Sequence, residues 1–343
     1  MRGGFVDRVS AKGQQDDGRS QATGRLVVVL VAGAANLLVG AAKAVVGVIS
    51  GSAALQAEAA HSVADTVTEV FLFIAARRGA RGPDSRHPFG YGRETYLWAF
   101  LAALATFVAG AGFSIARGIE TLFRGEPPDD TSMWVVYGVL AFAFVVEGGS
   151  LARGVREARH TAAALSLPPL DYLEDTTDTP VKAVIFEDTA ALIGLVLAAV
   201  GVSLRHLTGQ TAWDGLASIA IGALLVVTAA TLARANLSLL VGQTVRPELQ
   251  AALRGSLESL PGVVSVPVFV AVVIGPGSLM IAAKVHFESA STATDIERAA
   301  DEAERRLRAL SPGVRYVFLD PTPSVPEQAG PPGRTLATDD EEA

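Results

Sequence analysis

Long apolar stretches make up most of the first two thirds of the chain, and short segments rich in glycine or arginine separate them. Six stretches are long enough to cross a hydrocarbon layer of about 30 Å as helices. The pattern therefore predicts a six-helix membrane bundle over residues 25–236, preceded by a polar, disordered tail at residues 1–24. The expected spans are Leu26–Ile49, Ser52–Ala75, Thr95–Ile119, Met133–Leu151, Val181–Leu204 and Ala212–Ala235.

A different pattern begins after the sixth span and predicts a small α+β domain over residues 245–320. Every second residue from Val264 to Val272 is valine, which is typical of a half-buried strand. Thr294 and Glu297 have the spacing of a helix-capping box, and residues 321–343 are expected to form a disordered tail. The expected order is a helix from Pro247, a two-strand hairpin turning at Gly275–Gly277, a second helix and a third strand at Val314–Leu319.

Arginines in the short loops predict the orientation of the bundle. Five lie between Arg77 and Arg93, and three lie between Arg153 and Arg159. Because basic loops stay in the cytoplasm, these two loops are expected there. Because six is an even number of spans, both termini are then expected in the cytoplasm. The protein is expected to be a multi-pass protein of the cell membrane.

Composition narrows the function further. Half of the 343 residues are hydrophobic and the mean hydropathy is +0.37, as in a polytopic membrane protein with a modest soluble part. The formal net charge of −7 gives no indication of nucleic-acid binding. Since the chain contains no cysteine, a metal site would have to use imidazole and carboxylate ligands.

The second expected span carries polar residues at membrane depth. His61 and Asp65 are four residues apart, so they lie on one face of a helix, and Glu58 lies one turn earlier. Ionisable residues inside a membrane are costly and usually functional, although they can also serve only to join helices. We expect a divalent metal between these side chains.

A second charged cluster, Glu187 and Asp188, lies in the fifth expected span. Neighbours on a helix point about 100° apart, so at most one of the two can face a given point on the second span. The second and fifth spans run in opposite directions, and each carries its acids near its middle. The two clusters can therefore meet at similar depth.

Other polar residues in the spans have simpler interpretations. Asn36 is either a hydrogen-bond donor to the site or a contact between helices. Lys43 is expected to extend its long stem to the interface, and Glu147 is expected to be hydrated near the cytoplasmic end of its span. Asp214 is expected to cap its own helix.

These motifs together resemble the cation diffusion facilitator (cation efflux) family over about residues 25–320. The resemblance rests on the His61–Asp65 pair, the loop His87–Gly92, Asp188, six spans and the small domain at the end. It implies a ferredoxin-like cytoplasmic domain, a homodimer joined through both domains, and a divalent-metal site between the second and fifth spans. It also implies exchange of metal for protons, with zinc the most frequent substrate.

The chain departs from the family pattern at Val184, where many members have a histidine or aspartate ligand. A neighbouring Glu187 is similar to a branch of the family with Glu-Asp in this span. The resemblance leaves His61, Asp65 and Asp188 as ligands, with water, Glu187 or Asn36 at the open position of zinc. Glu58 would support the site from outside, and this ligand set would also accept iron, manganese or cobalt.

Some family members also bind metal in the terminal domain. His286 and Asp320 are at positions similar to two of those ligands, and Glu297 could replace a third. A sheet that dimerises without metal is the alternative that we favour.

The sequence therefore predicts a transporter that exports a divalent cation, zinc first, in exchange for protons. No prosthetic group is expected, and the partners are a second copy of the chain, the lipid bilayer and protons. A non-transporting, metal-sensing scaffold is the alternative supported by Val184. Nothing in the sequence resembles a nucleophile with a base and an oxyanion site, so an enzyme is not expected.

Overall fold

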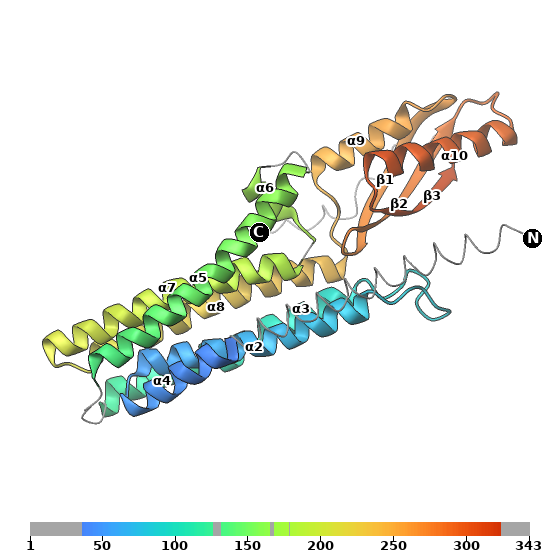
Figure 1. Cartoon of the computed structure of the whole chain (residues 1–343). Coiled ribbons are helices and arrows are strands. Elements are labelled where there is room, and N and C mark those ends of the chain that lie inside the picture. Colours follow the sequence, from blue (N-terminus) through green and yellow to red (C-terminus); the bar gives the residue numbers. More distant parts are fainter. Residues whose placement is uncertain (1–35, 126–131, 165–167, 178, 324–343) are drawn as a thin grey trace, which may run out of the picture. The chain divides into compact units, whose positions relative to one another are not determined.

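The computed structural model describes residues 36–125, 132–164, 168–177 and 179–323. The chain divides into two compact units, the first ending at Val241 and the second beginning at Gly242 (Figure 1). Residues 1–24, most of residues 321–343 and the first ten residues of the expected first span lie outside the described part.

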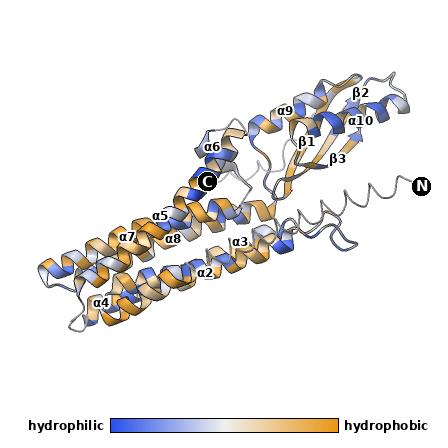
Figure 2. Cartoon of the chain, in the orientation of Figure 1, coloured by the Kyte–Doolittle hydropathy of each residue, from blue (hydrophilic) through white to orange (hydrophobic). Residues whose placement is uncertain are grey.

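Within the described residues, five helical segments are long and apolar enough to cross a membrane. The described part of the first expected span is a helix at Asn36–Ile49, shorter than a full crossing. Six spans therefore remain a prediction. Figure 2 shows that hydrophobic residues predominate along the five segments. They are α2 (Ala53–Gly79), the segment Glu94–Arg124, α5 (Met133–Ala164), α7 (Thr179–Thr208) and α8 (Ala212–Val241).

The segment Glu94–Arg124 is interrupted by a widened π-helical turn. It consists of α3 (Glu94–Ala105), η1 (Thr106–Gly112) and α4 (Phe113–Arg124). Such turns are rare and often lie at functional sites. The Thr106 hydroxyl is 3.1 Å from that of Thr68, so η1 is joined to α2 by a hydrogen bond inside the bundle.

The connection into α2 is as tight as expected. Ser50 and Gly51 form the turn, and Gly51 has a φ of 65°, which favours glycine. The Ser52 hydroxyl accepts from the Leu55 amide and caps α2. The prediction that Asp214 caps its own helix α8 is wrong. Its carboxylate accepts hydrogen bonds from the Ala53 amide at 2.5 Å and from the Ser52 hydroxyl at 2.9 Å. Its carboxylate therefore joins α8 to the start of α2.

Small residues let the helices approach closely. A Cβ added to Gly118 of α4 would lie 2.6 Å from the Gly215 carbonyl oxygen of α8. Helices in membranes pack through such small residues, because apolar side chains gain little from leaving lipid. Large apolar side chains instead face outward, among them Val108, Trp134, Val145 and Val227.

The second unit is a three-stranded sheet with two helices, in the predicted order. Strand β2 pairs antiparallel with β1 and parallel with β3, which gives the order β1-β2-β3. Leu253 and Leu257 of α9 and Leu307 of α10 are fully buried. The elements are α9 (Pro247–Glu258), β1 (Val263–Gly275), β2 (Ser278–Phe287), α10 (Ala293–Leu310) and β3 (Val314–Pro321).

The alternating valines of β1 do not form one buried face. Val266 is buried, but Val268 and Val270 are exposed, and Phe269 and Ala271 are buried in their place. The pairing of β1 with β2 shifts between Ser265 and Val268. An irregularity of this kind reverses the two faces of a strand, which a strict two-residue period cannot anticipate.

The capping box of α10 lies two residues before the predicted position. The Thr292 hydroxyl accepts from the Asp295 amide, and the Asp295 carboxylate accepts from the Thr292 amide at 3.0 Å. The sequence repeats a threonine at positions 292 and 294, and the earlier one is used. Glu297 is therefore free of the capping role that we predicted for it.

Candidate metal site

His61 and Asp65 lie together inside the bundle on α2. His61 Nδ1 is 3.3 Å from Asp65 Oδ1, and the His61 side chain is 1% exposed. In the described part of the chain, both ring nitrogens of His61 and the Asp65 Oδ1 have no hydrogen-bond partner. Buried polar atoms without partners are costly and call for an explanation such as an absent ion or water.

Helix α7 brings Glu187 and Asp188 to the same level. A Cβ on Gly194 of α7 would lie 2.1 Å from Glu58 Oε1 of α2, so these two residues face each other. Helices α2 and α7 run in opposite directions (Figure 1). Asp65 is seven residues after Glu58, and Glu187 is seven residues before Gly194. Because both helices rise 1.5 Å per residue, Asp65 and Glu187 lie at one depth.

Electrostatics agree with this register. The charge of Asp65 acts on Glu187, and that of Asp188 acts on both. Glu187 is 7% exposed, and Glu187 Oε1 and Asp188 Oδ2 have no hydrogen-bond partner among the described residues. Three carboxylates and one imidazole from two helices therefore share a buried region.

These side chains do not yet form a finished coordination shell. Among the described residues, no group of three or more histidine, aspartate or glutamate side chains is arranged to hold a metal ion as it stands. The types of donor fit a divalent cation, because imidazole and carboxylate suit zinc and its neighbours.

Hydroxyl groups around the acids were not predicted. The Thr68 hydroxyl of α2 lies near the Glu187 carboxylate, and the Ser150 hydroxyl of α5 lies near the Asp188 carboxylate. The Thr68 hydroxyl also contacts Thr106 of η1. Thr68 is seven residues after His61, so the sequence alone places both on one face of the helix. This spacing is weak evidence for a role in the site, because threonine is common in helices of this kind.

Lys43 and Glu147 are placed differently from the prediction. Lys43 does not extend to the interface: it is fully buried, and its Nζ donates to Glu58 Oε2 at 3.0 Å and to Glu147 Oε1 at 2.6 Å. Glu147 is 7% exposed, so it is not in a hydrated position. Glu58 therefore contacts Lys43 next to the candidate site. A buried charge is costly without a partner of opposite charge, and here the carboxylates of Glu58 and Glu147 are the partners of the Lys43 ammonium.

Among the described residues, no hydrogen bond joins Asn36 to His61 or Asp65. The Asn36 side-chain amide donates to Glu69 Oε1 at 2.7 Å and joins the first described helix to α2. Of the two roles left open for Asn36, this contact supports the one between helices.

The loop containing His87 is ordered around Asp84. The carboxylate accepts from the Arg86 and His87 amides and from the Tyr91 hydroxyl at 2.7 Å. These hydrogen bonds, that of Tyr91 above all, lower the pKa of Asp84 to about 2. The His87 ring packs against Tyr91 with 4.1 Å between centroids and an angle of 36° between the ring planes. In this structure the loop motif is a compact turn.

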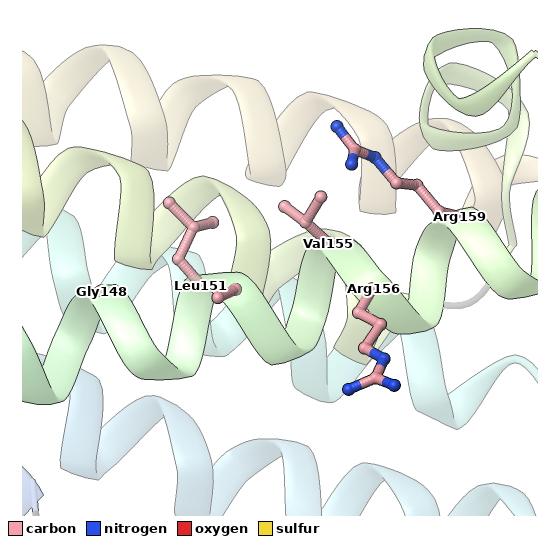
Figure 3. A pocket seen from close by; sticks show the side chains of 6 residues that line it. Gly148, Leu151, Val155, Arg156 and Arg159 are labelled. Atoms are coloured by element: carbon pink, nitrogen blue, oxygen red, sulfur yellow. The ribbon is translucent and has the colours of Figure 1, made fainter.

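A shallow groove of about 400 Å³ runs along α5. It is lined by Gly148, Leu151, Ala152, Val155, Arg156 and Arg159. Figure 3 shows the two arginines projecting to different sides of the helix. The lining contains neither carboxylate nor imidazole, so this groove is not part of the candidate metal site.

The three residues considered in the second unit have separate surroundings. Asp320 accepts from Lys284 Nζ at 2.9 Å. His286 Nδ1 is 3.1 Å from the Thr322 carbonyl oxygen. Glu297 lies exposed on α10. A regulatory metal shared by all three would have to displace two of these contacts.

Comparison with known proteins agrees with the arrangement of the first unit. Residues 29–241 match the family model described as the cation efflux transmembrane domain. The chain is 33% identical over 241 residues to the "Proton-coupled zinc antiporter SLC30A9, mitochondrial" of Xenopus laevis. The aligned region covers 70% of this chain and 43% of the relative.

Two further relatives are a plant and a bacterial protein. The chain is 31% identical to "Metal tolerance protein C4" of Arabidopsis thaliana, over 74% of this chain and 55% of the relative. It is 31% identical to "Zinc transporter ZitB" of Pectobacterium atrosepticum over 144 residues, 42% of this chain and 45% of the relative. The chain thus spans about half the length of these relatives.

Proposed function

Because the chain belongs to the cation efflux family, we propose that it exports a divalent metal cation across a membrane in exchange for protons. Members of this family are transporters and not enzymes. The observation that carries the proposal is the shared depth of Asp65 on α2 and Glu187 on α7, with His61 beside the first and Asp188 next to the second. His61 and Glu187 are buried, Asp65 and Asp188 are partly buried, and all four carry polar atoms without a hydrogen-bond partner among the described residues.

His61, Asp65 and Asp188 are the proposed ligands of the transported ion. Glu187 or water completes the shell, and Thr68 and Ser150 orient the two acids of α7 through their hydroxyl groups. An incomplete shell suits a carrier, since an ion that is held by every available ligand is released slowly. The Val184 position supplies no ligand, because a valine side chain has no donor atom.

Exchange with protons follows from the donor chemistry. An imidazole nitrogen or a carboxylate oxygen binds either a proton or a metal ion, so loading the metal releases protons and loading protons releases the metal. Support comes from the Xenopus relative, whose name describes a proton-coupled zinc antiporter.

Zinc is the proposed first substrate, with manganese, iron and cobalt as alternatives for the same donor set. Two of the three relatives above are named for zinc, and another, 27% identical, is named a manganese efflux system protein, MneS of Bacillus subtilis. We further propose a homodimer in the cell membrane with both termini in the cytoplasm, as the family resemblance and the arginine loops imply.

Flux measurements in lipid vesicles test this function. We expect wild-type protein to carry zinc at a rate that rises with an opposing pH gradient, and Asp65→Asn and Asp188→Asn to lose more than 90% of that flux. Glu120→Gln is the matched control, because Glu120 is an exposed carboxylate of α4 paired with Arg117 and Arg124.

The alternatives give different results. A passive channel would carry zinc regardless of the pH gradient. A metal-sensing scaffold would bind zinc without any flux. Wild-type flux in both aspartate variants would contradict the site.

A further inference from the structure

Three oxygen atoms surround the ammonium group of Lys43 inside the bundle. Its Nζ donates to Glu147 Oε1 at 2.6 Å, to Glu58 Oε2 at 3.0 Å and to Ser62 Oγ at 3.1 Å. The side chains of Lys43 and Glu58 are fully buried, and that of Glu147 is 9% exposed. Oxygens converging on one buried positive charge form the arrangement that a bound cation would have.

The lysine does not use all of the oxygens around it. Glu58 Oε1 and Glu147 Oε2 are buried without a hydrogen-bond partner in the part of the chain that the structure describes. Two carboxyl groups therefore share one ammonium group. The cluster of Glu58, Ser62 and Glu147, named here the oxygen cradle, thus has acceptor capacity beyond what Lys43 needs.

The oxygen cradle lies beside the proposed transport site. Glu58 and Ser62 flank His61 on α2, three residues before it and one residue after it. A divalent ion entering this region would meet two acidic positions, one around Asp65 and Asp188 and one around Glu58 and Glu147. Carboxylate and hydroxyl oxygens are ligands that divalent cations such as manganese accept.

We propose that Lys43 is a tethered cation that fills the oxygen cradle and so confines the transported ion to the site around His61, Asp65 and Asp188. This inference rests on the proposed function. Lys43 is a positioning residue: its ammonium contacts no transported ion but occupies the oxygens that would otherwise capture one. Removal of the ammonium converts the oxygen cradle into a second metal site.

The number of bound ions tests this directly. The full-length chain is purified in detergent, dialysed against zinc and, separately, manganese, and its bound metal is counted. Lys43→Met is expected to bind about one more ion per chain than wild type. Adding Glu147→Gln to Lys43→Met removes part of the oxygen cradle, and the count is expected to return to that of wild type.

A second variant tests whether the result with Lys43→Met reflects misfolding. Lys43→Gln keeps two hydrogen-bond donors near the carboxylates, and it too is expected to gain an ion. Equal counts in wild type, Lys43→Met and Lys43→Gln overturn the proposal. A lysine with a structural role alone would lower the melting temperature when replaced, but it would leave the count unchanged.

Failure of the proposed function has another signature. In the same dialysis, Asp65→Asn is expected to lose the ion that wild type binds in the membrane unit. If Asp65→Asn binds and transports zinc like wild type, the transport site is wrong, whatever Lys43 does. If Asp65→Asn loses its ion but Lys43→Met gains none, only the inference about Lys43 fails.

Discussion

At the scale of single residues, the carboxylate of Glu58 depends on the absence of a side chain at Gly194. An added Cβ there would lie 2.1 Å from Glu58 Oε1, so the carboxylate would have to move. Lys43 holds the other oxygen of that carboxylate at 3.0 Å. Movement of Glu58 therefore strains a buried ion pair, which is costly when broken.

Gly194→Ala is expected to destabilise the protein by about 1–3 kcal/mol, the usual cost of overpacking a well-filled interior. The check is thermal unfolding of the full chain in detergent. Gly149→Ala on α5 is the control, because a Cβ there meets nothing within 4 Å. Equal melting temperatures of the two variants would contradict the close contact between Gly194 and Glu58.

The sequence could predict the His61–Asp65 pair but not the partners of Lys43. The four-residue interval between His61 and Asp65 was visible in the sequence, and the structure places the two 3.3 Å apart. The partners of Lys43 were not visible, because Glu147 is 104 residues away along the chain. A lysine in an apolar stretch was assigned to the interface for lack of a known partner.

At the scale of elements, the start of α10 is fixed by Thr292 and Asp295. The Thr292 side chain and then its backbone amide are the main causes that lower the pKa of Asp295. A lowered pKa in the folded state means that the ionised carboxylate stabilises the fold. This stabilisation is fully present above the unfolded value, near 3.9, and is lost as the pH falls through the folded value.

Hydrogen exchange of the first-turn amides of α10 measures this cap in the full chain. Protection factors are expected to be constant above about pH 5 and to fall below about pH 4, as the ordinary aspartate pKa implies. Thr292→Ala is expected to lower protection about fivefold, equivalent to about 1 kcal/mol. Thr294→Ala is the matched control, and a larger loss of protection in Thr294→Ala than in Thr292→Ala would favour the cap that the sequence predicted.

Element order was more predictable than the faces of the elements. The turn at Gly275–Gly277 and the hairpin that it joins are confirmed. The buried face of β1 was predicted wrongly, because the irregular pairing between Ser265 and Val268 is decided by the partner strand. The π-helical turn η1 was missed for a similar reason: it depends on contacts with α2 and α8, such as Gly110 against Leu225.

At the scale of the whole molecule, the proposed site lies on two antiparallel helices of the first unit, α2 and α7. The length of the apolar stretches predicted a bundle, and five helical segments long and apolar enough to cross a membrane are found among the described residues. The register of α2 and α7 could not be predicted, because it is set by the contact between Glu58 and Gly194. That register is what brings Asp65 level with Glu187.

We propose above that His61, Asp65 and Asp188 hold the transported ion together. A structure of the zinc-loaded protein with anomalous scattering locates the ion most directly. We expect a peak between α2 and α7, about 2.0–2.2 Å from a ring nitrogen of His61 and from carboxylate oxygens of Asp65 and Asp188. A zinc-loaded structure in which these three residues remain apart, with no peak between the two helices, would contradict it.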